Sequence, residues 1–287
     1  MTSPESRVPS PTPTLPTDIK ITVARALDED IGNGDLTSRL LAVDSTASAA
    51  VVCKEQAVVC GIPWFNEIYR QLDPSFRIDW KVKDGDDLMP NQTVCTLQGS
   101  ARVMLSGERT ALNFLQLLSG TATITRDYVA LLEGTRTKLL DTRKTIPGLR
   151  TAQKYAVVCG GGRNHRMGLY DAILIKENHI SAAGSIAAAL ERAGAIHSNV
   201  EIEVETLEEF KDALACGAKQ ILLDDFDLAS MKEAVRINAG RATLEISGGV
   251  TRETIQKIAA TGVDFISVGA LTKNVRAIDY SMRVVNG

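Results

Sequence analysis

The spacing of apolar residues changes along the first hundred positions of the chain. From Asp18, a residue type that favours helix N-termini, the apolar residues Ile19, Val23 and Leu27 keep a helical spacing that stops at Gly32. Short runs rich in β-branched residues then follow, separated by Gly, Pro, Asp and Asn. These runs occupy residues 49–53, 57–60, 76–82 and 93–97. The pattern predicts a small antiparallel α+β domain.

Two further helices are expected in this half of the chain. The first covers residues 63–72. The second is a long helical segment over residues 102–132, and we expect an interruption at Ser119 and Gly120, two weak helix formers. This long segment leads into a second unit with a different pattern.

The second unit repeats a short apolar run, a polar or glycine residue, and an amphipathic helix. The runs occupy residues 138–141, 172–176, 201–205, 220–224, 243–247 and 265–269. From Glu203 onward their ends recur about every 22 residues, the length of one β-α unit. The repeat predicts an α/β fold of parallel strands, arranged as a barrel or an incomplete barrel. An open doubly wound sheet is the alternative, weakened by the absence of a Gly-x-Gly-x-x-Gly motif after the first run.

Composition narrows the class of protein. The chain has 287 residues, 44% of them hydrophobic, and a net charge of -3. No apolar run approaches the roughly 20 residues of a membrane helix, and no global positive charge favours nucleic acid, so we expect neither partner. Five widely spaced cysteines without a Cys-x-x-Cys motif predict reduced thiols in a cytoplasmic protein. Residues 1–17, rich in Pro, Ser and Thr, are expected to form a disordered tail.

Polar residues end the predicted strands. The carboxyl ends of parallel barrel strands meet at one mouth, so residues far apart in the sequence are expected to share a site. They are Asp141, Lys176, Glu203, Asp224, Ser247 and Gly269. A single polar residue at a strand end is ordinary, but the combined chemistry of these six residues favours a shared site. Glu203 and Asp224 end neighbouring strands, which suits Mg²⁺; simple solvation of the rim is the alternative.

Positive charge is concentrated between residues 141 and 179. This segment holds seven Lys or Arg against three Asp or Glu, a net charge of +4 in an acidic chain. Guanidinium groups bind carboxylates and phosphates through two oxygens, so the segment predicts a polyanionic small substrate. We assign to the site the cations at or just after strand ends, which are Arg143, Lys144, Arg166 and Lys176. The remaining cations are interpreted as solvated, and they are Arg150, Lys154 and Arg163.

Glycine-rich turns supply a second anion signal. A run of three glycines at 160–162 precedes His165 and allows close backbone approach to a pocket. The segment 247–249 and Gly269 each precede an expected helix, and helix N-termini after the last two barrel strands often bind phosphate. This pair predicts a phosphorylated ligand.

Many of these motifs occur in one order. They are Asp-Thr-Arg-Lys-Thr-Ile-Pro-Gly at 141–148, Gly-Gly-Gly-Arg-Asn-His-Arg at 160–166, Ile-Lys-Glu-Asn-His at 175–179, Leu-Asp at 223–224, Ser-Gly-Gly at 247–249 and Ser-Val-Gly-Ala at 267–270, preceded by segments 29–37 and 107–113. In this order they resemble quinolinate phosphoribosyltransferase (nicotinate-nucleotide pyrophosphorylase, carboxylating) over nearly all the chain after the tail. Asp225 departs from the family, which more commonly has Asn there. An added carboxylate bears on metal affinity unless it points to the opposite face of the strand.

The resemblance implies a fold and a reaction. The fold is an N-terminal α/β sandwich, residues 18–112 with 276–287 returning to it, followed by an open α/β barrel over 113–275. The reaction joins quinolinate to phosphoribosyl pyrophosphate with Mg²⁺ and releases pyrophosphate and CO2. Its product, nicotinate mononucleotide, belongs to de novo NAD biosynthesis.

The resemblance also implies roles for residues. Arg143, His165 and Arg166 would hold the quinolinate carboxylates, and Arg109 would reach in from a second subunit of a homodimer or larger assembly. The catalytic set would be Lys144 and Lys176 between the substrates, with Glu203 and Asp224 facing the ribose and Mg²⁺. The phosphate would be taken by Ser247, Gly248, Gly249 and Gly269.

Two other functions remain open from sequence. A related enzyme acting on another aromatic acid is expected to lack part of the Arg143, His165 and Arg166 set, and all three are present. A non-catalytic anion-binding module is expected to lose the carboxylates Glu203 and Asp224, and both are present. Both alternatives are therefore disfavoured.

Overall fold

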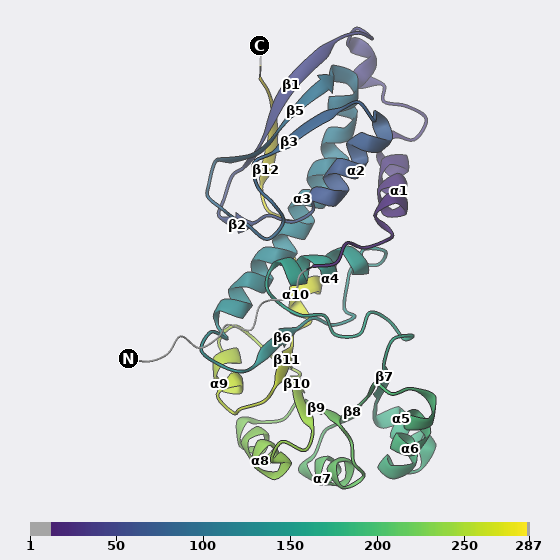
Figure 1. Cartoon of the computed structure of the whole chain (residues 1–287), viewed down its shortest axis with the longest axis vertical. Coiled ribbons are helices and arrows are strands. Elements are labelled where there is room, and N and C mark those ends of the chain that lie inside the picture. The colour runs from purple at the N-terminus through teal and green to yellow at the C-terminus, as the bar shows by residue number, and fades with distance from the viewer. Residues whose placement is uncertain (1–12, 286–287) are drawn as a thin grey trace. The chain divides into compact units, whose positions relative to one another are not determined.

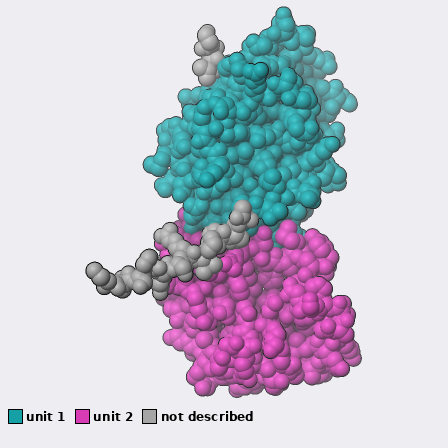
Figure 2. Space-filling model, in the orientation of Figure 1, with its two compact units in different colours: residues 1–126, 146–161, 271–287 teal, residues 127–145, 162–270 magenta. Residues whose placement is uncertain are grey.

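The computed structural model describes residues 13–285, which divide into two compact units (Figure 2). The first unit contains residues up to 126 together with 146–161 and the chain from 271 onward. The second contains residues 127–145 and 162–270. Most of the expected tail, residues 1–12, lies outside the described residues.

The first unit is an antiparallel sheet packed with helices (Figure 1). Its four strands run in the order β12 (Tyr280–Val285), β1 (Thr46–Cys53), β5 (Gln92–Ser100) and β3 (Arg77–Trp80), and β2 (Ala57–Val58) pairs separately with β4 (Asp87–Leu88). The helical segments are α1 (Ile19–Ile31), η1 (Thr37–Leu40), α2 (Ile62–Leu72), α3 (Ala101–Ala130), α4 (Arg150–Cys159) and the short α10 (Ala270–Lys273). Strand β12 pairs antiparallel with β1, so the C-terminal residues lie in the first sheet.

The core of the first unit forms around α2. This helix buries Trp64, Phe65 and Tyr69 on one face, and the Tyr69 ring stacks on Phe76 with 4.5 Å between ring centroids. Its N-terminus is satisfied by Asp84, whose Oδ1 accepts hydrogen bonds from the first backbone N–H groups of the helix. The apolar face and the capped end together explain why this segment is helical.

The long helix α3 is continuous, so the expected interruption at Ser119 and Gly120 is wrong. The Ser119 hydroxyl donates to the carbonyl oxygen of Cys60 and accepts from the Cys60 N–H. Gly120 lies against the backbone carbonyl of Arg276, where a side chain would not fit. These contacts outweigh the low helix propensity of both residues. Neither α3 nor any other helix among residues 13–285 is both long and apolar enough to cross a membrane.

The second unit is built on a parallel sheet of six strands. Their order is β6 (Lys138–Leu140), β11 (Phe265–Ser267), β10 (Thr243–Ser247), β9 (Gln220–Asp224), β8 (Val200–Val204) and β7 (Ile173–Ile175). The intervening helices are α5 (Glu177–Ala183), α6 (Ile186–Ile196), α7 (Leu207–Ala215), α8 (Leu228–Asn238) and α9 (Ile255–Ala259). A doubly wound sheet requires a point where the strand order reverses, and from β7 to β11 there is no such reversal. Strands β6 and β7 are the outer strands of the sheet. The expected open barrel is confirmed.

The unit boundaries differ from those expected at 112 and 275. Residues 113–126, 146–161 and 271–275 belong to the first unit. Packing explains the placement of α4, because Tyr155 lies edge-on to Trp64 and its hydroxyl donates to Asp84. The interpretation of Lys154 as solvated is wrong, because its side chain is fully buried on the packed side of α4.

The close approach at Gly120 gives a stability test. Gly120→Ala introduces a Cβ that collides with the Arg276 carbonyl, and we expect a loss of about 1–3 kcal/mol in unfolding free energy. The matched control is Gly194→Ala in α6, where nothing lies within 4 Å of the new Cβ, and it is expected to gain about 0.4–1 kcal/mol. Urea unfolding of both variants measures the difference. Equal effects at the two positions would contradict the packing argument.

Candidate active site

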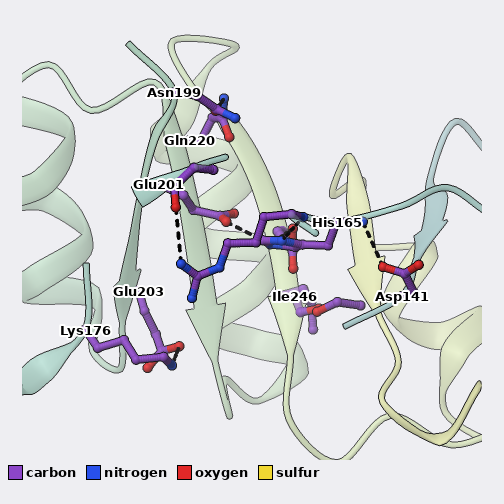
Figure 3. Close-up of polar contacts among 12 residues, drawn as sticks. Asp141, His165, Lys176, Asn199, Glu201, Glu203, Gln220 and Ile246 are labelled. Carbon is purple, nitrogen blue, oxygen red and sulfur yellow. Dashed lines mark hydrogen bonds and ion pairs between the residues drawn. The ribbon is translucent and has the colours of Figure 1, made fainter. Parts of the chain in front are cut away.

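The structure brings all but one of the expected site residues into the second unit, on the strand ends and the segments that follow them. Figure 3 shows His165, Lys176 and Glu203 among them. On the strands, Lys176 follows β7, Glu203 lies in β8, Asp224 ends β9, Ser247 ends β10, and Gly269 follows β11. On connecting segments, Arg143 and Lys144 follow β6, while His165 and Arg166 follow the glycines after α4. Arg109 is exposed on α3 in the first unit.

Carboxylates gather at the ends of β8 and β9. Glu203 forms an ion pair with Lys176, and the two side chains meet at the carboxyl end of the sheet in Figure 3. Burial raises the pKa of Asp224, and the negative charges of Glu203 and Asp225 raise it further. Two acids that repel each other favour a bound cation, so the pair Glu203 and Asp224 has the chemistry to hold a divalent metal.

The Gly248–Gly249 turn differs from the expected helix N-terminus. Helix α9 begins only at Ile255, so Gly248 and Gly249 form a separate turn with φ of 91° and 56°. Such a turn can still present backbone N–H groups to an anion. Gly269 does directly precede α10, which has four residues, and the stem of Lys144 lies beside it.

Asp225 lies against this turn. It follows the last residue of β9 and adopts φ of 53°, so the expectation that it points to the opposite face of the strand does not apply. Its carboxylate occupies the space that a Cβ on Gly248 would need. The departure from the family pattern therefore places a negative charge beside the turn expected to bind phosphate.

Two guanidinium groups of the site, those of Arg143 and Arg166, lie near each other. Burial lowers the pKa of Arg166, and the positive charge of Arg143 lowers it further. One nitrogen of Arg166 donates to the carbonyl oxygen of Ala172 at 3.2 Å. The Arg166 loop is fixed by Asp171, which accepts from the N–H groups of Met167 and Gly168. Like charges held together in this way favour an anion with more than one carboxylate.

His165 is built into the frame of this site. Its Nδ1 accepts from the backbone N–H of Arg166 at 2.7 Å, and its Nε2 lies 2.9 Å from Oε2 of Glu201. Because Nδ1 accepts, Nε2 carries the proton and donates it to Glu201. Asp141, expected at the mouth, is fully buried and accepts from the backbone of His165 and the side chain of Asn164.

Sequence reasoning missed Glu201 and Glu245. Both lie inside parallel strands and are less than one-tenth exposed. Strands that are covered on both faces usually consist of apolar residues alone. A glutamate inside such a strand is unusual, and this was the sequence feature that could have pointed to both residues.

An open parallel barrel whose mouth joins paired carboxylates, a glycine turn and clustered cations defines an enzyme that handles small polyanions. Comparison with known proteins makes this specific. The description "Quinolinate phosphoribosyl transferase, N-terminal domain" matches residues 35–119, and "Quinolinate phosphoribosyl transferase, C-terminal domain" matches residues 121–283. The chain belongs to the quinolinate phosphoribosyltransferase family.

Individual relatives agree with this membership. A probable nicotinate-nucleotide pyrophosphorylase [carboxylating] of Bacillus subtilis is 42% identical, covering 89% of this chain and 90% of the relative. The solved nicotinate-nucleotide pyrophosphorylase of Francisella tularensis superposes with a TM-score of 0.92 at 48% identity, covering 95% of this chain and 98% of that one. Human nicotinic acid phosphoribosyltransferase shares only the fold, with a TM-score of 0.66 at 14% identity over 95% of this chain and 77% of that one.

The Gly248 turn gives a binding test. Gly248→Ala strains a positive φ and displaces the Asp225 carboxylate, so we expect pyrophosphate affinity to fall about tenfold, roughly 1.4 kcal/mol. Gly217→Ala matches the strain, with φ of 82°, but has open space around the new Cβ. Isothermal titration with pyrophosphate compares the two variants with the parent protein. Unchanged affinity in Gly248→Ala would remove the turn from the binding site.

Proposed function

We propose that this chain catalyses phosphoribosyl transfer from phosphoribosyl pyrophosphate to quinolinate, with decarboxylation to nicotinate mononucleotide in NAD biosynthesis. Family membership supports the reaction, and relatives such as the Nicotiana glauca quinolinate phosphoribosyltransferase [decarboxylating] 2 carry its name. The observation that carries the proposal is the Arg143 and Arg166 pair in the same unit as Glu203, Asp224 and the Gly248 turn. A dicarboxylate and a phosphorylated sugar are the ligands that this combination fits.

The first step forms the glycosidic bond. The lone pair of the pyridine nitrogen bonds to C1 of the ribose, while the C1–O bond to pyrophosphate breaks and pyrophosphate leaves with its electron pair. Arg143 and Arg166 orient the pyridine ring through its carboxylates, which converts an encounter of two anions into a bound pair. Glu203 and Asp224 place negative charge where the ribose carbon becomes positive. Lys144 and Lys176 supply positive charge between the two substrates.

The second step removes the carboxylate next to the ring nitrogen. The bond from C2 to the carboxylate breaks, CO2 leaves, and the electron pair stays on C2 beside the positively charged nitrogen until C2 takes up a proton. The ring itself stabilises the charge, so the protein has to hold the ring and limit access of water.

Magnesium is part of this proposal. The donor set fits it, because Glu203 and Asp224 offer hard oxygen ligands. Burial raises the pKa of Asp224, and the negative charges of Glu203 and Asp225, which a cation would offset, raise it further. When bound, Mg²⁺ neutralises charge on the pyrophosphate leaving group. Asp225 adds a third carboxylate beside these two.

The test of the reaction is direct. Purified protein mixed with quinolinate, phosphoribosyl pyrophosphate and Mg²⁺ is expected to release CO2 and nicotinate mononucleotide in equal amounts, and excess EDTA is expected to stop the reaction. Nicotinate is the matched control substrate, because it lacks the second carboxylate that the two guanidinium groups need, and we expect at least about a hundredfold lower kcat/KM for it. Comparable turnover of both acids would contradict the assignment.

We also propose that the active site is shared between two subunits of a homodimer. Arg109 is exposed on α3 in the first unit, whereas the other substrate cations lie in the second unit. A two-fold dimer that brings Arg109 of one subunit to the barrel mouth of its partner adds a guanidinium to the carboxylate pocket and covers the mouth. A solvated surface role for Arg109 is the alternative, and it would contribute little.

Mixing two variants decides between these alternatives. Arg109→Ala and Lys144→Ala are each expected to be nearly inactive. In a mixed dimer, symmetry leaves one site with both residues intact, so activity is expected to return to about half of normal per mixed dimer. Subunit exchange is followed independently with differently tagged chains. Exchange without recovery of activity would show that the site is not shared.

The cytoplasm is the proposed location. All five cysteines are free, and four of them are buried. Buried thiols without disulfides are typical of a reducing compartment.

A further inference from the structure

The carboxyl group of Glu245 is buried next to the ring of His165. Glu245 projects from the middle of β10 and is 4% exposed. Its Oε2 lies 3.5 Å from Nε2 of His165, and its Oε1 is buried with no hydrogen-bond partner. A buried carboxyl oxygen without a partner is costly, so its presence calls for an explanation.

Glu245 belongs to a group of three. One ligand atom each from His165, Glu201 and Glu245 lie within 4.8 Å of one another. The ring of His165 donates a single proton, from Nε2, and that proton goes to Glu201 at 2.9 Å. Two carboxyl groups therefore share one N–H donor. If both were ionised, two negative charges would repel each other in a buried site, so the geometry calls for one more proton between the two acids.

The two residues that pair with Glu245 in the sheet are uncharged. Its neighbours in the sheet are Leu222 on β9 and Phe265 on β11. The titratable groups that act on it are Glu201 from β8 and, from the segment after α4, His165, and the Ser267 side chain of β11 forms a hydrogen bond with it. Arg166 adds positive charge near Glu201. A cavity of about 360 Å³ adjoins the group and is lined in addition by Arg163 and Arg166.

Burial sets the protonation state. Burial is the largest cause, and together with the charge of Glu201 it raises the pKa of Glu245 to about 8, against smaller opposing effects of His165 and of a hydrogen bond with Ser267. The unfolded side chain has an ordinary pKa near ~4.3. At neutral pH the folded protein therefore holds Glu245 as a neutral acid with an O–H to donate.

We propose that Glu245 is a positioning residue that shares its proton with Glu201 and so fixes His165 and the adjoining Arg166 for binding of the pyridine dicarboxylate. The link to Arg166 is direct, because its backbone N–H donates to Nδ1 of His165. Ionisation of Glu245 puts two charges under the imidazole and displaces this segment. The inference rests on the proposed function for its substrate, while the proton itself is testable without any substrate.

Three variants test the proposal kinetically. In the parent protein, about one-tenth of Glu245 remains neutral one pH unit above its pKa, so the KM for quinolinate is expected to rise about tenfold by about pH 9. Glu245→Gln keeps a neutral donor and is expected to remove this rise. Glu245→Leu removes the donor and is expected to raise the KM at every pH, with less effect on the KM for phosphoribosyl pyrophosphate. Glu191→Gln, an exposed acid on α6, is the matched control and is expected to follow the parent profile.

Thermal unfolding gives a readout without substrate. A carboxyl whose pKa is raised on folding loses its contribution to stability as the pH rises through the folded value, here about 8. The melting temperature of Glu245→Gln is therefore expected to rise relative to the parent between about pH 6 and about pH 9. Failure of quinolinate turnover in the parent would refute the proposed function and leave this measurement intact.

Two results would overturn the proposal. One is a Glu245→Gln variant whose KM and melting temperature follow the same pH dependence as the parent. The other is a stoichiometric metal ion in the purified protein that is lost on mutation of Glu245, because a cation bound by the three residues would replace the shared proton.

Discussion

The hydrogen bond from His165 to Glu201 joins the two parts of the candidate site, which are the strands of the parallel sheet and the irregular segment that carries His165 and Arg166. Glu201 lies within β8, a strand with neighbours on both sides, so its position is set by the sheet. His165 lies on an irregular segment after three glycines, where Asp141 accepts from its backbone N–H and Asp171 accepts from those of Met167 and Gly168. The contact with Glu201 adds a direct link from the His165 ring to the sheet. Arg166 is the next residue, so the placement of a substrate cation depends on a bond made by its neighbour.

The polar interior of the barrel is arranged in levels. Glu201 and Glu203 are two residues apart in β8 and so face the same side. Figure 3 shows Asn199 and Gln220 toward one end of the strands, Glu201 and His165 in the middle, and Lys176 with Glu203 at the carboxyl end. Lys176 and Glu203, at the carboxyl end, belong to the set proposed to bind ligands, and Glu201 with His165 lies one level further into the barrel. A site built in this way tolerates charge at the mouth because the groups below are paired or neutral.

Much of the fold followed from the sequence, because a parallel β-α repeat leaves a strong periodic signal. The strands at β9 and β10 coincide with the apolar runs that predicted them. The continuity of α3 was not predictable, since Ser119 and Gly120 are stabilised by partners distant in the sequence. Charged strand ends identified the mouth of the barrel. Glu245 could not be assigned to the site from the sequence, because its role depends on His165 and Glu201, which lie close to it only in the folded protein.

The pairing of β12 with β1 has a consequence for synthesis of the protein. Strand β12, which borders β1, follows every strand of the barrel in the sequence and is made after them. Until the residues of β12 leave the ribosome, that edge of β1 exposes unpaired backbone groups, which invite pairing with other chains. Strands β1 and β5 precede every strand of the barrel, so β1 stays paired on one edge only while the barrel strands are being made. The first sheet is therefore completed last, and its open edge has to be protected from pairing with other chains until β12 arrives.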